Sequence, residues 1–138
     1  MKYLVDANVL SEGTKPAPQS MVLDWVQAHE QELAINPIIL GEVEYGILSL
    51  PRGQRRARLT AWFAQAVQYL PVLPLDENSA PIWARLLDDL RRKVRAMPVK
   101  DSLIAVTALQ HDLIIATRNV SDYRYCGAQV VNPFVPPT

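Results

Sequence analysis

Short apolar segments alternate with longer segments of helical periodicity along this chain of 138 residues, and this alternation is its strongest constraint on fold. The segments that predict strands are Lys2–Val5, Leu33–Ile35, Val72–Leu75, Leu113–Ala116 and Gln129–Val131. Strands that alternate with helices indicate βα units and a mainly parallel sheet. We therefore expect one α/β domain over residues 1–138, with three layers: a central sheet of about five strands and helices on both faces.

Helix-start signals lie between the strand segments. Ser20 is a possible cap for a helix over residues 20–29, and Asn36 is expected to cap a helix that begins at Pro37. Apolar residues at helical spacing predict two further helices, at residues 55–69 and 81–95. A last helix is expected to open at Asp101, in the segment D-S-L-I-A-V-T-A-L.

Composition excludes several classes of protein. A hydrophobic fraction of 49% is typical of a globular domain rather than a disordered chain. The single cysteine, Cys126, excludes a disulfide framework and a cysteine-based zinc site. The first apolar stretch is very short and ends at Asp6, so we expect no signal peptide, no membrane span and a cytoplasmic location.

The net charge of zero hides an uneven distribution. Residues 1–50 hold two basic and seven acidic side chains, whereas residues 51–100 hold ten basic and four acidic ones. The basic side chains form two runs, Arg52–Arg58 and Arg91–Lys100. Such runs can follow a phosphate backbone. A solvated helix face, or a helix C-terminus favoured by the dipole, would explain them equally well.

Three acidic residues fall where the predicted elements end or begin. Asp6 closes the first strand, Glu42 lies in the helix after Asn36, and Asp101 opens the last helix. In a parallel α/β sheet such positions collect at the carboxyl ends of the strands, where ligands bind. Two carboxylates about 5 Å apart repel by roughly 3 kcal/mol at an effective dielectric of 20. A hard divalent cation, Mg²⁺ or Mn²⁺, is the usual remedy.

Each acid also has a purely structural interpretation. Asp6 could cap a turn, and Asp101 could simply favour a helix N-terminus by about 0.3–1 kcal/mol. Asp101 shares its helix side with small apolar residues, and this favours a functional role, because a buried charge needs a partner or a metal. Periodicity does not choose between Glu42 and Glu44. Lys100 could contact substrate or act as a counter-charge.

Polar residues also follow the fourth predicted strand. Thr117 and Asn119 could bind phosphate or orient a metal-bound water at this strand end. Asp122 could support the site from behind or cap a short turn. Asn8 could hold the Asp6 carboxylate in place.

Taken together, these segments resemble the PIN-domain ribonucleases, in particular the VapC-type toxins of bacterial toxin–antitoxin pairs. The resemblance covers nearly the whole length, and the segments that carry it are Y-L-V-D-A-N-V-L-S-E, G-E-V-E-Y-G-I, K-D-S-L-I-A-V-T-A-L, I-I-A-T-R-N-V-S-D-Y and V-N-P-F. It implies a PIN-like fold, direct metal binding by Asp6 and Asp101, and Glu42 rather than Glu44 as the third acid.

The chain departs from the family pattern at two positions. Ala7 stands where family members usually have Thr, which removes one hydroxyl near the metal. Asn119 stands where some relatives carry a fourth acid, so a second metal would bind weakly.

The resulting hypothesis is an Mg²⁺-dependent endoribonuclease, the toxin of a two-protein system, in which Mn²⁺ can replace Mg²⁺. The resemblance implies an RNA substrate, a VapB-type antitoxin that inserts a basic side chain into the acidic crevice, and contact with DNA only through that antitoxin. The apolar helices suggest a homodimer. The alternatives are a PIN-family processing nuclease without an antitoxin, a phospho-accepting receiver domain and a non-catalytic PIN-like binding module.

Overall fold

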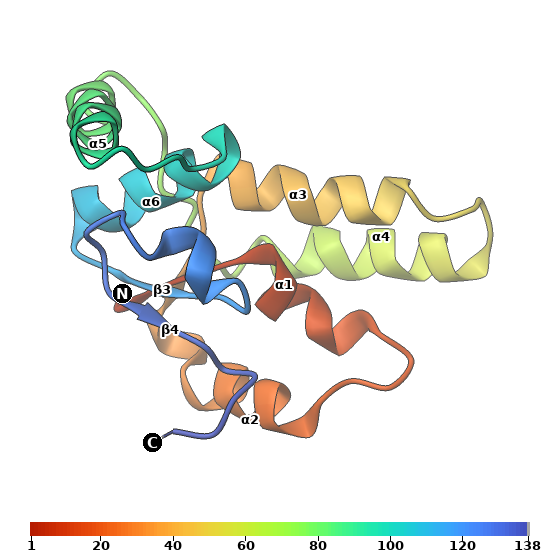
Figure 1. Cartoon of the computed structure of the whole chain (residues 1–138). Coiled ribbons are helices and arrows are strands. Elements are labelled where there is room, and N and C mark those ends of the chain that lie inside the picture. The colour runs from red at the N-terminus through yellow and green to blue at the C-terminus, as the bar shows by residue number, and fades with distance from the viewer. Residues whose placement is uncertain (138) are drawn as a thin grey trace.

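Four short parallel strands form the centre of the molecule, and the computed structural model describes residues 1–137 (Figure 1). The strands lie in the order β2-β1-β3-β4, so β1 is interior. Tyr3 of β1 pairs with Leu33 on one side and with Ile114 on the other. The strands are β1 (Tyr3–Val5), β2 (Leu33–Ala34), β3 (Ile114–Ala116) and β4 (Val130–Val131), and the helices are α1 (Ala7–Leu10), α2 (Ser20–Ala28), α3 (Pro37–Leu48), α4 (Gln54–Ala66), α5 (Ala80–Arg92) and α6 (Val99–His111).

Helices cover both faces of the sheet, as the alternation of elements predicts (Figure 1). Helix α6 packs on β1 and β3 from one side, and α5 packs on the outside of α6. Helix α2 lies on the opposite side, where Trp25 contacts the ring of Tyr3 edge-on with centroids 4.9 Å apart. The three-layer α/β prediction is confirmed.

The segment predicted as a strand at Val72–Leu75 forms only one bridge, between Val72 and Ile35. Two hydrogen bonds hold it at the sheet edge: Ile35 N–H donates to the carbonyl of Pro71, and Leu73 N–H donates to that of Ile35. Pro74 has no N–H to continue the pairing. The sheet therefore has four strands among the described residues rather than about five.

Asn36 begins α3 in the way the Asn-Pro pair predicts. Its buried Oδ1 accepts a hydrogen bond of 3.0 Å from the backbone N–H of Ile39, and Pro37 is the first helical residue. The Asn36 amide also donates to Thr107 Oγ1, at 2.9 Å, which ties the start of α3 to α6. The expected cap at Ser20 is wrong, because Gln19 holds the cap position of α2 and makes no side-chain cap bond.

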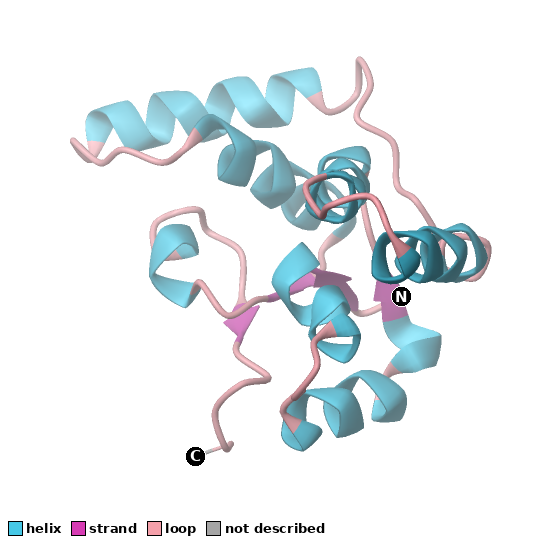
Figure 2. Cartoon of the chain, turned by 90° about the vertical axis from the view of Figure 1, so that its right-hand side faces the viewer, coloured by secondary structure: helices cyan, strands magenta, loops and turns pink. Residues whose placement is uncertain are grey.

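Helices α3 and α4 form a hairpin that extends away from the sheet (Figure 1). A separate apolar cluster holds the two helices together through Val43, Ile47 and Leu59, with Trp62 and Phe63 packed against them. The first basic run lies at the far end of this hairpin. Figure 2 shows the short strands across the centre of the molecule, with helices above and below them.

Local partners account for most of the second basic run. Arg91 and Arg92 both pair with Asp88, and Lys93 pairs with Asp89, all within α5 or its end. The guanidinium of Arg95 lies 4.5 Å from the centroid of the Tyr125 ring. These contacts support the structural interpretation of that run. No helix within residues 1–137 is both long and apolar enough to span a bilayer.

Candidate metal centre

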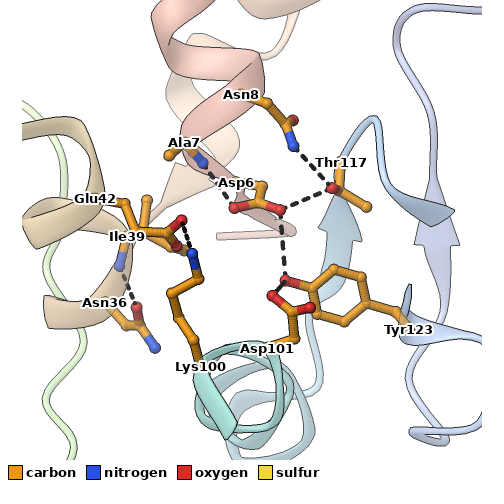
Figure 3. A network of polar contacts seen from close by, with 10 residues as sticks. All are labelled: Asp6, Ala7, Asn8, Asn36, Ile39, Glu42, Lys100, Asp101, Thr117 and Tyr123. Carbon is orange, nitrogen blue, oxygen red and sulfur yellow. Dashed lines mark hydrogen bonds and ion pairs between the residues drawn. The ribbon is translucent and has the colours of Figure 1, made fainter. Parts of the chain in front are cut away.

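Asp6 lies where the interior strand β1 ends and α1 begins. Its backbone N–H donates to the carbonyl of Ala116, which continues the pairing with β3. Its Oδ1 accepts from the N–H of Ala7 at 2.8 Å, and its Oδ2 accepts from the Thr117 hydroxyl at 2.7 Å (Figure 3). Asp6 is only 5% exposed. The capping role and the functional role are therefore compatible, since Oδ1, which accepts only from Ala7, keeps a lone pair for another ligand.

Asp101 occupies the first turn of α6, two residues after the helix begins at Val99. It is half-buried. Burial raises the pKa of its carboxyl group, and the nearby carboxylates of Asp122 and Asp6 raise it further, against the opposing charge of Lys100. The surroundings of Asp101 thus disfavour its ionised form, and a neighbouring cation would stabilise that form.

Glu42 points from α3 toward Asp6 and Asp101 and forms an ion pair with Lys100 (Figure 3). The space between the side chains of Asp6, Glu42 and Asp101 is called the crevice below. Glu42 Oε2 lies 3.0 Å from Lys100 Nζ, and the hydrogen bond and charge of Glu42 raise the pKa of the Lys100 ammonium. The other oxygen, Oε1, is buried and accepts no hydrogen bond. Glu44, two residues further along α3, is exposed. Of the two glutamates, the fold brings Glu42 to the crevice.

Thr117 follows β3 and is fully buried behind Asp6. Its hydroxyl donates to Asp6 and accepts from the side-chain amide of Asn8 at 3.4 Å and from the N–H of Asn119 at 3.1 Å. Asn8 Oδ1 in turn accepts from the N–H of Arg118. The Thr117 hydroxyl therefore orients Asp6 in this structure, and its contact with a phosphate or a water stays a prediction.

Asn119 and Asp122 lie in the turn that follows β3. Both are exposed, and the N–H of Asp122 donates to the carbonyl of Asn119 at 3.1 Å at the start of the 3₁₀ helix η3 (Val120–Tyr123). Asp122 is close enough to Asp101 to raise its pKa. Asp122 therefore lies near Asp101, whereas only the backbone N–H of Asn119 contacts the site, through Thr117.

Tyr123, the last residue of η3, also belongs to the site, although no sequence pattern singled it out. This side chain is fully buried, and its hydroxyl lies 3.4 Å from Asp6 Oδ2 and 3.4 Å from Asp101 Oδ1 (Figure 3). The residues around Tyr123 in the sequence do not indicate that its hydroxyl will contact Asp6 and Asp101, because both acids are distant from it along the chain.

The donor set fits a hard divalent cation. The crevice offers carboxylate oxygens from β1, α3 and α6, one of them the unpaired Glu42 Oε1, and the Lys100 ammonium shows that positive charge is already attracted there. As the side chains stand, no three acidic residues within 1–137 form a closed ligand group. In an α/β protein with a parallel sheet, ligands bind at the carboxyl ends of the strands, and these acidic residues lie there.

Comparison with known proteins identifies the family. The family model described as "PIN domain" matches residues 3–126, and the chain therefore belongs to the PIN-domain family. The chain is 31% identical to the VapC ribonuclease Y4jK of Sinorhizobium fredii over 138 residues, which cover 96% of this chain and 98% of the relative. It is 29% identical to the toxin FitB of Neisseria gonorrhoeae, over 95% of this chain and 97% of that protein.

Solved structures show the same fold. The structure of FitAB bound to an IR36 DNA fragment superimposes on this chain with a TM-score of 0.92, at 26% sequence identity, over 99% of this chain and 98% of that chain. The PIN-like α/β prediction and the resemblance to VapC-type toxins are both confirmed.

Proposed function

We propose that this protein is an Mg²⁺-dependent endoribonuclease and the toxin of a toxin–antitoxin pair. The observation that carries the proposal is the meeting of Asp6, Glu42 and Asp101 in one crevice, from three separate elements of a PIN-domain fold. The similarity to a VapC ribonuclease over nearly the whole chain supports RNA as the substrate.

The three acids are proposed to hold the cation, with Mn²⁺ able to replace Mg²⁺. When bound, Mg²⁺ supplies Lewis-acid activation of the scissile phosphate and of the attacking water. The chain itself orients the ligands: the Ala7 N–H and the Thr117 hydroxyl fix the two oxygens of Asp6. Asn119, which is exposed, is available to orient a phosphate or water, and Asp122 adds negative charge beside Asp101.

The position of Lys100 supports an acidic crevice that is open to an antitoxin. A lysine from this chain already reaches Glu42, with its side chain 58% exposed, so a basic side chain from outside can reach the same oxygen. The proposed partner is a VapB-type antitoxin that covers the crevice, and DNA would be bound only through it. We also propose a homodimer, which acts in the cytoplasm because its substrate is cellular RNA.

Two matched variants of the glutamates test this proposal. Glu42→Gln removes a charge from the crevice, and Glu44→Gln makes the same change on the exposed side of α3. We expect Glu42→Gln to reduce RNA cleavage by at least about a hundredfold at fixed Mg²⁺, since a metal ligand is lost, and Glu44→Gln to cleave at close to the parent rate.

The measurement is the rate of cleavage of a mixed RNA substrate by the purified protein, with folding of each variant checked by its melting temperature. Equal rates for the two variants, or a larger loss for Glu44→Gln, would contradict the assignment of Glu42. Loss of cleavage on adding the product of a small neighbouring reading frame would support the antitoxin.

A further inference from the structure

The hydroxyl of Tyr123 lies between two of the three acids of the crevice. Tyr123 is 1% exposed, and its ring is part of the main apolar core. The hydroxyl is 3.4 Å from Asp6 Oδ2, at the end of β1, and 3.4 Å from Asp101 Oδ1, in the first turn of α6 (Figure 3). One side chain therefore contacts both carboxylates from inside the core.

The chemistry of a phenol suits this place. A neutral phenol has one proton to donate, so at a given moment it can donate to only one of the two acids. Burial, followed by the charges of Asp6 and Asp101, raises the pKa of Tyr123, so the hydroxyl stays protonated at neutral pH. A neutral donor shared by two carboxylates lowers the cost of their repulsion without adding a charge that would exclude a cation.

We propose that Tyr123 is a positioning residue for the cation site, whose hydroxyl fixes the carboxylates of Asp6 and Asp101 relative to each other. This inference rests on the metal site of the proposed function. Hydrogen-bond partners behind metal ligands fix their orientation, and losing one typically weakens metal binding about 10–100-fold. Thr117 already holds Asp6 in this way, whereas Tyr123 is placed to set Asp6 relative to Asp101.

A role in packing alone predicts a different outcome. The ring of Tyr123 fills the core, and a phenylalanine would fill it equally well. Tyr125 provides the matched control, because it is a partly buried tyrosine two residues away whose ring contacts Arg95 instead of the acids. Tyr123→Phe and Tyr125→Phe each remove one oxygen and leave a ring in place.

The test is the affinity of the metal-free protein for Mn²⁺, measured by isothermal titration calorimetry. We expect Tyr123→Phe to weaken Mn²⁺ binding about tenfold or more, and Tyr125→Phe to change it by less than about twofold. RNA cleavage by Tyr123→Phe should recover partly as Mn²⁺ is raised, because the chemical groups are intact and only their alignment is poorer.

A second measurement needs no metal. If the Tyr123 hydroxyl acts on Asp101, the shifts in urea midpoint caused by Tyr123→Phe and by Asp101→Asn should not be additive in the double variant. The shifts caused by Tyr125→Phe and by Asp101→Asn should be additive, because Tyr125 does not contact the acids. Mn²⁺ affinity equal to the parent in Tyr123→Phe, or additive shifts in its double variant, would overturn the positioning role and leave the metal site intact. A parent protein that binds no Mn²⁺ would instead overturn the metal site of the proposed function, and this inference with it.

Discussion

Replacing Asp101 by Asn should stabilise the metal-free protein, although it removes an acidic residue from a helix N-terminus. The carboxylate oxygens of Asp101 and Asp6 each lie 3.4 Å from the Tyr123 hydroxyl, so they are within roughly 7 Å of each other. At that distance two charges repel by about 0.6–2.4 kcal/mol for effective dielectrics between 80 and 20. The lost interaction with the helix dipole costs only about 0.3–1 kcal/mol.

The expected net gain is therefore about 1 kcal/mol, which for a chain of this size raises the melting temperature by roughly 3 °C. The sign also depends on pH. Because the folded-state pKa of Asp101 is raised above its unfolded value, the metal-free protein loses stability as pH rises from about 4 through the folded pKa. The variant has no such group, so its advantage should be larger at pH 7.5 than at pH 4.

Thermal melts of the parent and Asp101→Asn at both pH values, with EDTA and then with Mg²⁺, check this reasoning. Mg²⁺ should raise the melting temperature of the parent and leave that of the variant nearly unchanged, because the variant has lost a ligand. A variant that melts below the parent at pH 7.5 with or without metal, and still responds to Mg²⁺, would show that Asp101 acts only at the helix start.

Two further changes test neighbouring parts of the structure. Lys100→Met should tighten Mn²⁺ binding in calorimetry by up to about fivefold, because Mn²⁺ no longer competes with the Lys100 ammonium for Glu42, and a half-exposed ion pair contributes no more than about 1 kcal/mol. Weaker Mn²⁺ binding by the variant would instead show that Lys100 supports cation binding. Asn36→Ala should lower the free energy of unfolding in urea by about 2–4 kcal/mol, since a buried helix cap and a bond to Thr107 are both lost; Asn36→Ser, which keeps a capping oxygen, should lose less.

Local signals predicted the elements of the fold well, and pairing between distant segments explains what they missed. The Asn36-Pro37 start of α3 is encoded by adjacent residues, so it could be predicted. The segment at Val72 has the apolar residues of a strand, but it meets only Ile35 at a sheet edge, between two prolines. Whether this segment forms a full strand depends on the segment it pairs with, and the sequence of one segment does not identify its partner.

In the candidate site, too, local sequence signals identified some residues, whereas the choice between others depends on contacts between distant segments. Asp6 and Asp101 could be singled out because a strand end and a helix start are visible in the sequence. The choice between Glu42 and Glu44 depends on how α3 is rotated against α6, and helical periodicity left that open. Burial alone would not have identified the site either. Glu12 is 1% exposed, like Tyr123, yet its carboxylate is bound by Lys15 and by the N–H of Gln19, close to it along the chain.

The Mg²⁺ dependence of RNA cleavage by the parent protein and by Asp6→Asn tests the central claim most directly. Asp6 is the acid that the fold fixes most firmly, through Ala7, Thr117 and Tyr123. The parent should cut RNA in proportion to bound Mg²⁺ and stop when EDTA is added, while Asp6→Asn should remain folded and inactive at every Mg²⁺ concentration. Cleavage that persists in EDTA, or that survives in Asp6→Asn, would contradict a metal-dependent nuclease centred on these carboxylates.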